Sequence, residues 1–235
     1  MSTKMTEEVS CPQCGAAVET ELWPGVDAAE HPELRSRVLD ETMFDWTCPE
    51  CGYRARFLYP FLYHDPHRRF LVYLSPAGEA RGCGAADVEA EFPQFGGFVK
   101  RVVFSPEALK EKILIFESGL DDLAVELLKL ALGGVLDRKY GKKTSAGYFC
   151  FADEEENRIG FSFLQEGETE PVRRQTRLDA YRRSLQIVKS AGPRTQGGFL
   201  PVDAVTARRV LDDYRGNEET EETEEEKQNG SEREE

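Results

Sequence analysis

The amino-acid sequence predicts an α+β fold. Three observations support this class: two nearly identical cysteine motifs lie in the first 52 residues, an aromatic-rich stretch follows them, and the later part shows helical periodicity. Strands and helices do not alternate regularly, which disfavours a doubly wound parallel sheet. The 235 residues are enough for one large or two small domains with real cores.

The first half of the chain predicts a short helix and two strands. Pro32–Leu39 is typical of a helix, because proline suits the first turn, where no backbone N–H is needed. Tyr53–Tyr63 is rich in aromatic residues with partial alternation, and Phe70–Leu74 is a second strand. The turn-forming residues 64–67 lie between these strands, so the sequence predicts a hairpin.

The second half is richer in helical pattern. Ser105-Pro106-Glu107 begins a helix that Gly119 ends, and Asp121-Asp122 begins another that Gly133-Gly134 ends. The further predicted elements are strands at Phe98–Phe104, Tyr148–Ala152 and Arg158–Leu164, and helices at Arg177–Lys189 and Asp203–Tyr214.

Cys11-Pro12-Gln13-Cys14-Gly15 and Cys48-Pro49-Glu50-Cys51-Gly52 are almost the same pentapeptide used twice. Two residues between the cysteines let each loop fold back, so that both sulfurs face one point about 2.3 Å away. Glycine after the second cysteine permits a positive φ. Four thiolates fill a tetrahedral shell, so the sequence predicts one structural zinc ion at Cys11, Cys14, Cys48 and Cys51.

Other uses of the four cysteines are weaker explanations. A redox pair of the same spacing is expected to open a helix within a βαβ pattern, which is not found. Iron in the same thiolate shell stays an alternative, since the ligand type does not exclude it. The 33 residues between the two motifs exceed the usual short spacer, and the helix at 32–39 would occupy this insertion.

These motifs resemble the CpXC-domain family, named for its Cys-Pro-x-Cys signature. The similarity extends from the two knuckles to Trp23, Pro32-Glu33-Leu34 and Leu62-Tyr63-His64-Asp65, and then to a stretch from Glu111 through Gly119-Leu120-Asp121-Asp122 to Leu127. It covers residues 9–165. The resemblance implies a zinc-ribbon-like fold and a metal site, and it implies no activity.

The sequence therefore predicts three segments. Residues 9–98 form a zinc-ribbon-like CpXC domain with an inserted helix, and residues 99–215 form an α+β region of helices and a β-hairpin. Residues 216–235 form an acidic tail that we expect to be disordered, because it has no apolar residue with which to offset its ordering entropy.

Outside the knuckles, the ligand-like side chains have simpler explanations. His64, Asp65 and His67 could hold a metal or act as an acid–base pair, but a turn containing proline explains them better. Asp121 and Asp122 are better explained by helix capping than by paired-carboxylate chemistry. The remaining cysteines, Cys83 and Cys150, are single; Cys83 lies beside Arg81, where a reactive thiol is conceivable.

Charge and hydropathy limit the classes of partner. The net charge is −14, of which the tail contributes −8 through ten glutamates against one lysine and one arginine. This acidic balance disfavours nucleic acid, whose binders use basic surfaces, although local basic pairs such as Arg173-Arg174 and Arg182-Arg183 occur. There is no apolar run of about 18 residues and no secretory signal, so we expect a cytoplasmic location without a membrane span.

Three hypotheses follow for function. We expect first a zinc-binding cytoplasmic protein that acts as an interaction or regulatory module, with a protein partner. The alternative is a nucleic-acid-binding zinc-ribbon protein, by analogy of fold. The third is an enzyme that uses the His64-Asp65-His67 turn or Cys83. No catalytic constellation is found in the sequence, and it specifies no oligomeric state.

Overall fold

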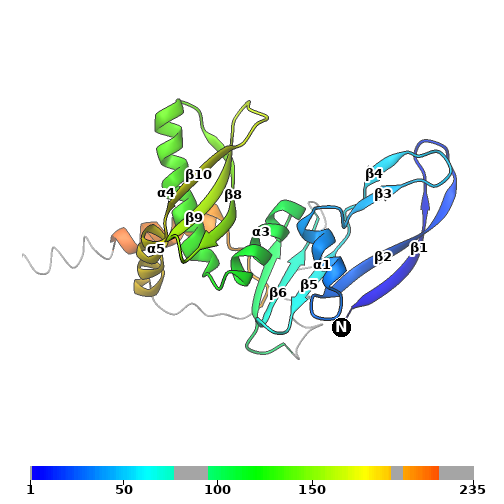
Figure 1. Cartoon of the computed structure of the whole chain (residues 1–235), viewed down its shortest axis with the longest axis horizontal. Coiled ribbons are helices and arrows are strands. Elements are labelled where there is room, and N and C mark those ends of the chain that lie inside the picture. Colours follow the sequence, from blue (N-terminus) through cyan, green and yellow to red (C-terminus); the bar gives the residue numbers. More distant parts are fainter. Residues whose placement is uncertain (1, 77–94, 192–197, 217–235) are drawn as a thin grey trace, which may run out of the picture. The chain divides into compact units, whose positions relative to one another are not determined.

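The computed structural model describes residues 2–76, 95–191 and 198–216 (Figure 1). The chain divides into two compact units. The N-terminal unit runs to Glu117 and includes residues 198–201, and the C-terminal unit begins at Ser118 and includes the residues from Val202 onward. Each unit contains both helices and strands, which confirms the predicted α+β class.

The N-terminal unit is built on a mixed five-stranded sheet in the order β1-β2-β5-β6-β7. Its strands are β1 (Thr3–Ser10), β2 (Ala17–Asp27), β5 (Phe61–Asp65), β6 (Phe70–Leu74) and β7 (Val99–Val103). The pairs β1–β2 and β5–β6 are antiparallel, whereas β2–β5 and β6–β7 are parallel. The hairpin β5–β6 confirms the predicted hairpin.

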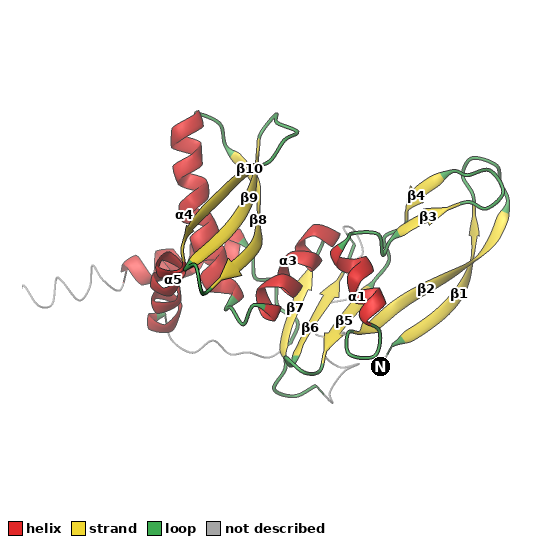
Figure 2. Cartoon of the chain, in the orientation of Figure 1, coloured by secondary structure: helices red, strands yellow, loops and turns green. Residues whose placement is uncertain are grey.

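Two helices pack on one face of this sheet, as Figure 2 shows: α1 (Pro32–Leu39) and α3 (Pro106–Glu117), both at their predicted positions. Alternating residues of the strands, among them Phe61, Tyr63 and Phe70, are fully buried beneath them. Arg35 of α1 donates two hydrogen bonds of 2.6 Å to the Glu117 carboxylate of α3, which ties the two helices together.

A short ribbon, β3 (Asp45–Thr47) paired with β4 (Arg54–Arg56), stands apart from the main sheet. The prediction of one continuous strand over Tyr53–Tyr63 was wrong, because β4 ends at Arg56 and β5 starts at Phe61. Pro60 lies between them, and proline cannot donate the N–H that a continuous ladder needs.

The C-terminal unit has an antiparallel sheet, β10-β9-β8, joined to helices. Its elements are α4 (Asp122–Tyr140), β8 (Thr144–Asp153), β9 (Arg158–Gln165), β10 (Val172–Arg177), α5 (Leu178–Ser190) and a helix over residues 204–216. Phe149, Ile159, Phe161 and Phe163 are buried on one face of the sheet, while Leu123 and Leu127 of α4 pack with the helix that contains Ala207.

Helix α4 does not end at Gly133-Gly134 as predicted but continues to Tyr140. Glycine costs about 1 kcal/mol in a helix interior. The buried side chain of Leu136, which lies beyond both glycines, offsets this cost. The helix ends instead at Gly141, whose φ of 67° forms a left-handed cap.

The boundary between the units lies later in the chain than the predicted break at Phe98. Strand β7 pairs in parallel with β6, and α3 packs on the same sheet, so both belong to the N-terminal unit. Strands β1, β2, β3 and β10 were not predicted at all. Cys83 and residues 217–235 of the acidic tail lie outside the described residues.

Within the described part of the chain, every helix is too short or too polar to cross a membrane.

The core of the N-terminal unit yields the first prediction. Truncating the fully buried Phe61 to alanine leaves a cavity, and we expect the Phe61→Ala variant to lose about 3–5 kcal/mol of unfolding free energy. Urea unfolding followed by circular dichroism measures this loss. The matched change at exposed Leu58, Leu58→Ala, should cost less than about 0.5 kcal/mol. Equal losses for the two variants would contradict this account of the core.

Candidate metal centre

The first cysteine loop closes the antiparallel hairpin β1–β2, whose last pair before the loop is Ser10 with Ala17. Within the loop, the Cys11 N–H donates to the Ala16 carbonyl at 2.9 Å, and the Gly15 N–H donates to the Cys11 carbonyl at 2.9 Å. Gly15 has a φ of 72°, the left-handed conformation that the motif predicted for this position.

The second cysteine loop closes the ribbon β3–β4 in the same way. The Cys48 N–H donates to the Tyr53 carbonyl at 2.8 Å, and the Gly52 N–H donates to the Cys48 carbonyl at 2.9 Å. Gly52 has a φ of 74°. The two pentapeptides therefore fold into equivalent loops, each at the end of its own pair of strands.

The two loops bring four sulfur atoms together. The Sγ atoms of Cys11, Cys14, Cys48 and Cys51 all lie within 4.8 Å of one another. In the described residues this is the sole group of three or more histidine, cysteine or acidic side chains whose ligand atoms converge. Cys11 and Cys48 are buried, whereas Cys14 and Cys51 are exposed.

The spacing between the loops fits a tetrahedral metal site. Sγ of Cys11 lies 3.7 Å from Sγ of Cys51, and Sγ of Cys14 lies 3.8 Å from Sγ of Cys48. Four sulfurs placed tetrahedrally at about 2.3 Å from one ion are about 3.8 Å apart. A disulfide needs an S–S distance of about 2.0 Å, so these contacts are not disulfides. The four cysteines could hold a metal ion.

Backbone hydrogen bonds to sulfur prepare this site for thiolates. Burial raises the pKa of Cys11, but the N–H groups of Cys14 and Gln13 and the neighbouring thiols outweigh it and lower that pKa to about 7. At Cys51 the Tyr53 N–H lowers the pKa, yet burial and the three other cysteines together raise it to about 12. The Cys11 thiol thus ionises readily, whereas the pKa values of Cys14 and Cys51 are raised. A divalent cation would stabilise all four as thiolates.

A small apolar cluster joins the two loops. Trp46 of β3 packs with Cys11 and Cys48, and the ring centroids of Trp46 and Phe57 are 4.9 Å apart. The Trp46 indole Nε1–H donates to Oγ1 of Thr20 on β2 at 3.0 Å. This contact fixes the ribbon β3–β4 against the hairpin β1–β2. We call residues 9–20 and 45–57 the cysteine arm.

The sequence identified the cysteines of this centre but not the residues that position them. β1 gave no amphipathic signal because nearly all of its residues are exposed, whereas the alternation of Val18-Glu19-Thr20-Glu21-Leu22 was a signal that could have revealed β2. The repeated Cys-Pro-x-Cys-Gly motif was itself a signal that each loop closes a hairpin. Trp46 and Thr20 carried no recognisable pattern, because their contact joins residues that are 26 positions apart.

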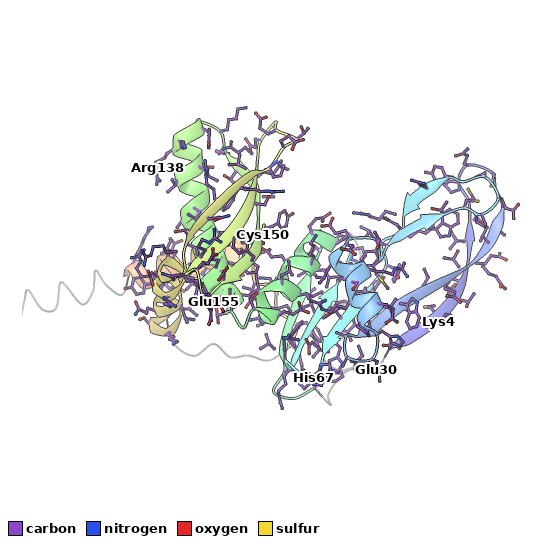
Figure 3. All side chains as sticks on the ribbon, viewed as in Figure 1. Lys4, Glu30, His67, Arg138, Cys150 and Glu155 are labelled. Atoms are coloured by element: carbon purple, nitrogen blue, oxygen red, sulfur yellow. The ribbon has the colours of Figure 1, made fainter. Side chains whose placement is uncertain are left out.

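The turn residues His64, Asp65 and His67 do not form a second site. Asp65 is buried and accepts hydrogen bonds from the backbone N–H of Arg68 at 2.9 Å and from its guanidinium at 3.0 Å. His67 is exposed in the turn between β5 and β6 (Figure 3). The carboxylate thus closes the turn, as a Pro-containing turn predicts.

His64 points to a different partner. Its Nδ1 lies 3.2 Å from Oδ2 of Asp27 on the neighbouring strand β2, and its ring packs against Phe95 and Phe98. Its Nε2 is buried without a hydrogen-bond partner in the described part of the chain. Burial lowers the pKa of His64 below its ordinary value, although Asp27 opposes this shift.

The other candidates from the sequence have structural positions. The Asp121 carboxylate accepts a hydrogen bond of 2.8 Å from the Ala124 N–H, so this residue caps α4 as predicted. Cys150 is exposed on β8 in the C-terminal unit (Figure 3).

The fold and the site together define a class: an α+β protein in which two cysteine hairpins converge on a four-sulfur centre. The chain belongs to the CpXC family, since it matches the family described as CpXC protein over residues 9–129, about half of its length. No curated protein and no solved structure matches the chain. The family match confirms the resemblance that the cysteine motifs suggested.

The buried His64 generates a prediction on pH dependence. Because burial lowers its pKa in the folded state, the unfolded chain binds the proton more readily, so stability should fall as the pH drops below the ordinary histidine value of about 6.5. We expect the stability difference between pH 7 and pH 5.5 to shrink in His64→Gln and to persist in His67→Gln, measured by urea unfolding. An NMR titration in which His64 protonates at or above its ordinary value would refute this account.

Proposed function

We propose that Cys11, Cys14, Cys48 and Cys51 hold one structural zinc ion. The observation that carries this proposal is the tetrahedral spacing of four sulfurs between two equivalent loops, with cross-loop distances of 3.7 and 3.8 Å. Four thiolates leave no open position for water or substrate, which is the arrangement of a structural site rather than a catalytic one. The geometry of the arm supports the description zinc-ribbon-like, since each loop closes a β-hairpin.

Zinc is the metal that we favour for this site over iron. Both metals accept four thiolates, so the ligand set alone does not choose between them. Zinc has no redox chemistry and no geometric preference of its own, which suits an ion whose work is to join two hairpins. Because Cys14 and Cys51 are exposed to solvent, a redox-inactive ion gives a more durable link between the two hairpins than iron does.

We further propose that the protein is an interaction or regulatory module that works in the cytoplasm with a protein partner. A reducing compartment keeps four close thiols available for metal, which supports this location. The strands β5 and β6 bury their aromatic residues Phe61, Tyr63 and Phe70 in the core, so these side chains offer no surface to a partner. The strand β1, which leads into the cysteine arm, offers a better surface. It forms an edge of the sheet and is exposed along most of its length.

An exposed edge strand can accept an extended segment of another chain, with main-chain hydrogen bonds supplying affinity. On the outward side of the hairpin, Glu8 and Glu19 stand directly opposite each other. Like charges in this position destabilise a hairpin, so a basic segment that lies along β1 would relieve their repulsion. We therefore propose an extended, basic segment of a protein as the partner.

The zinc proposal makes a direct prediction. Elemental analysis of the purified chain should find about one zinc per chain, and Cys48→Ser should lose it, because three remaining ligands give a far weaker site. Chelator should shift the emission of Trp46, whose ring packs on Cys11 and Cys48. Cys150→Ser, which removes an exposed thiol outside the cluster, should keep the metal and the emission. A well-folded arm without metal would disprove the structural role. A finding of one iron per chain would identify the metal as iron and not zinc.

The interaction proposal has its own experiment. The full chain should form a cross-link to a protein partner through residues of β1, and Cys48→Ser should abolish it by loosening the arm. Cys150→Ser should cross-link like the original chain. If mass spectrometry finds no cross-linked peptide from β1 with the metal-loaded chain, β1 is not the interaction surface.

A further inference from the structure

The C-terminal sheet has two faces with different surroundings. Phe149, Phe161 and Phe163 point to the inner face and are buried. On this side α4 meets β8, where the Lys129 ammonium donates to the Gly147 carbonyl at 3.0 Å. Helix α5 packs on α4 through Ile187. These two helices therefore lie against the inner face.

The opposite face, which we call the outer face, is defined by the strand register. Directly paired residues of an antiparallel sheet share a face, so the outer residues form rows across β8, β9 and β10. The rows are Asp153-Arg158-Arg177, Phe151-Gly160-Gln175 and Tyr148-Ser162-Arg173.

The middle strand gives the outer face a shallow trough. Its outward positions include Gly160 and Ser162, so the side chains on both neighbouring strands stand higher than those between them. The Phe151 ring lies across Gly160, because a Cβ on that glycine would come within 2.2 Å of the ring. The ring keeps partial exposure. It therefore covers the trough at Gly160 and offers a flat apolar surface there.

The β10 side of the trough is basic. Arg173 and Arg177 are exposed on β10, and Arg177 stands directly opposite Arg158 of β9. Each of these two arginines has one acidic partner: Arg177 is ion-paired with Asp179 at 3.0 Å, and Arg158 is ion-paired with Glu156. A hollow of about 410 Å³ occurs at this end of the sheet. The lining residues are Glu156, Asn157, Arg158, Gln175, Thr176 and Arg177.

One buried atom of the hollow lacks a partner. The Asn157 amide nitrogen donates to Asp179 at 3.3 Å, whereas its Oδ1 is buried with no hydrogen-bond partner in the residues that the structure describes. A buried acceptor left unpaired is costly, so a ligand that offers a hydroxyl or amine there would gain binding energy. The hollow thus combines two arginines, each with one acidic partner, with an unpaired acceptor for a donor group.

We propose that the outer face of β8, β9 and β10 binds a short segment of single-stranded nucleic acid. A base stacks on the Phe151 ring, and phosphates lie along Arg173, Arg177 and Arg158, with a ribose or base donor near Asn157. Aromatic rings beside a basic groove are the elements that single-strand binders use, because every base has a π-face and every nucleotide a phosphate. This surface lies in the C-terminal unit, so the proposal does not depend on the metal centre.

Acidic residues at both ends of the sheet set the length of the segment. Glu154, Glu155 and Glu156 form the turn between β8 and β9, and Glu166 and Glu168 follow β9. Glu156 is paired with Arg158, and Glu168 with Lys142, which neutralises part of this charge. The remaining acids repel phosphate at both ends. They confine the nucleic acid to the few nucleotides that cross the trough.

Fluorescence anisotropy with a labelled uridine-rich RNA of about ten nucleotides tests the proposal on the full chain at low salt. We expect saturable binding that weakens steeply with salt. Phe151→Leu keeps an apolar cover on Gly160 but removes the ring, and it should weaken binding about tenfold. Arg173→Glu should weaken it at least as much. Arg183→Glu, the same charge change on the exposed surface of α5, should alter affinity less than about twofold.

Three results would overturn the proposal. The first is no saturable binding by the full chain, and the second is equal weakening by Arg173→Glu and Arg183→Glu, which would indicate diffuse attraction. The third is equal affinity for a polyglutamate peptide, which would make the ligand an acidic protein segment. If binding appears only after the ten tail glutamates are replaced by glutamine, the tail of this chain is the occupant of the face instead. Circular dichroism confirms that each variant is folded.

Discussion

The convergence of four sulfur atoms at the ends of two hairpins is the constraint on which the cysteine arm depends. Spacings of 3.7 and 3.8 Å between the loops are too long for disulfides and too short for four thiolates without a cation. The electrostatics agree with this, because the pKa of Cys11 is lowered whereas the three other cysteines help to raise the pKa of Cys51. A divalent ion would balance the charge of the four thiolates and would join the hairpin β1–β2 to the ribbon β3–β4.

This constraint matters because the arm has little else to hold it. Its apolar cluster contains three buried residues, whereas the core under α1 and α3 contains thirteen. A cluster of that size buries too little apolar surface to offset the ordering of two hairpins. The main sheet, by contrast, is stabilised by its own aromatic core. The proposed metal would therefore stabilise one part of the N-terminal unit, whereas the rest of the unit is stabilised by hydrophobic burial.

The sequence revealed those features that depend on local chemistry. The Cys-Pro-x-Cys-Gly repeat predicted both loops, since glycine geometry and ligand spacing act within five residues. Proline at position 32 and the cap at Asp121 located helix starts for the same reason. Parallel pairing of β6 with β7 and of β2 with β5 joins segments that are distant in sequence, so the extent of the N-terminal unit was not predictable. Strand β10 was missed because arginine and glutamine replace its apolar alternation, and the same residues make it a candidate binding edge.

The arginines of β10 change what the net acidity of the chain implies about its ligand. A net charge of −14 argues against nucleic acid only if the charge is spread evenly, and more than half of it belongs to the final 20 residues. Recognition depends on the local field, which falls off within about 10 Å at ordinary salt. Across the paired rows on the outer face of the C-terminal sheet there are three arginines and one aspartate, and two of these arginines are also ion-paired with Glu156 and Asp179. The four cysteines and this face lie in different units, so the metal that we propose and the ligand that we propose would bind to separate parts of the protein.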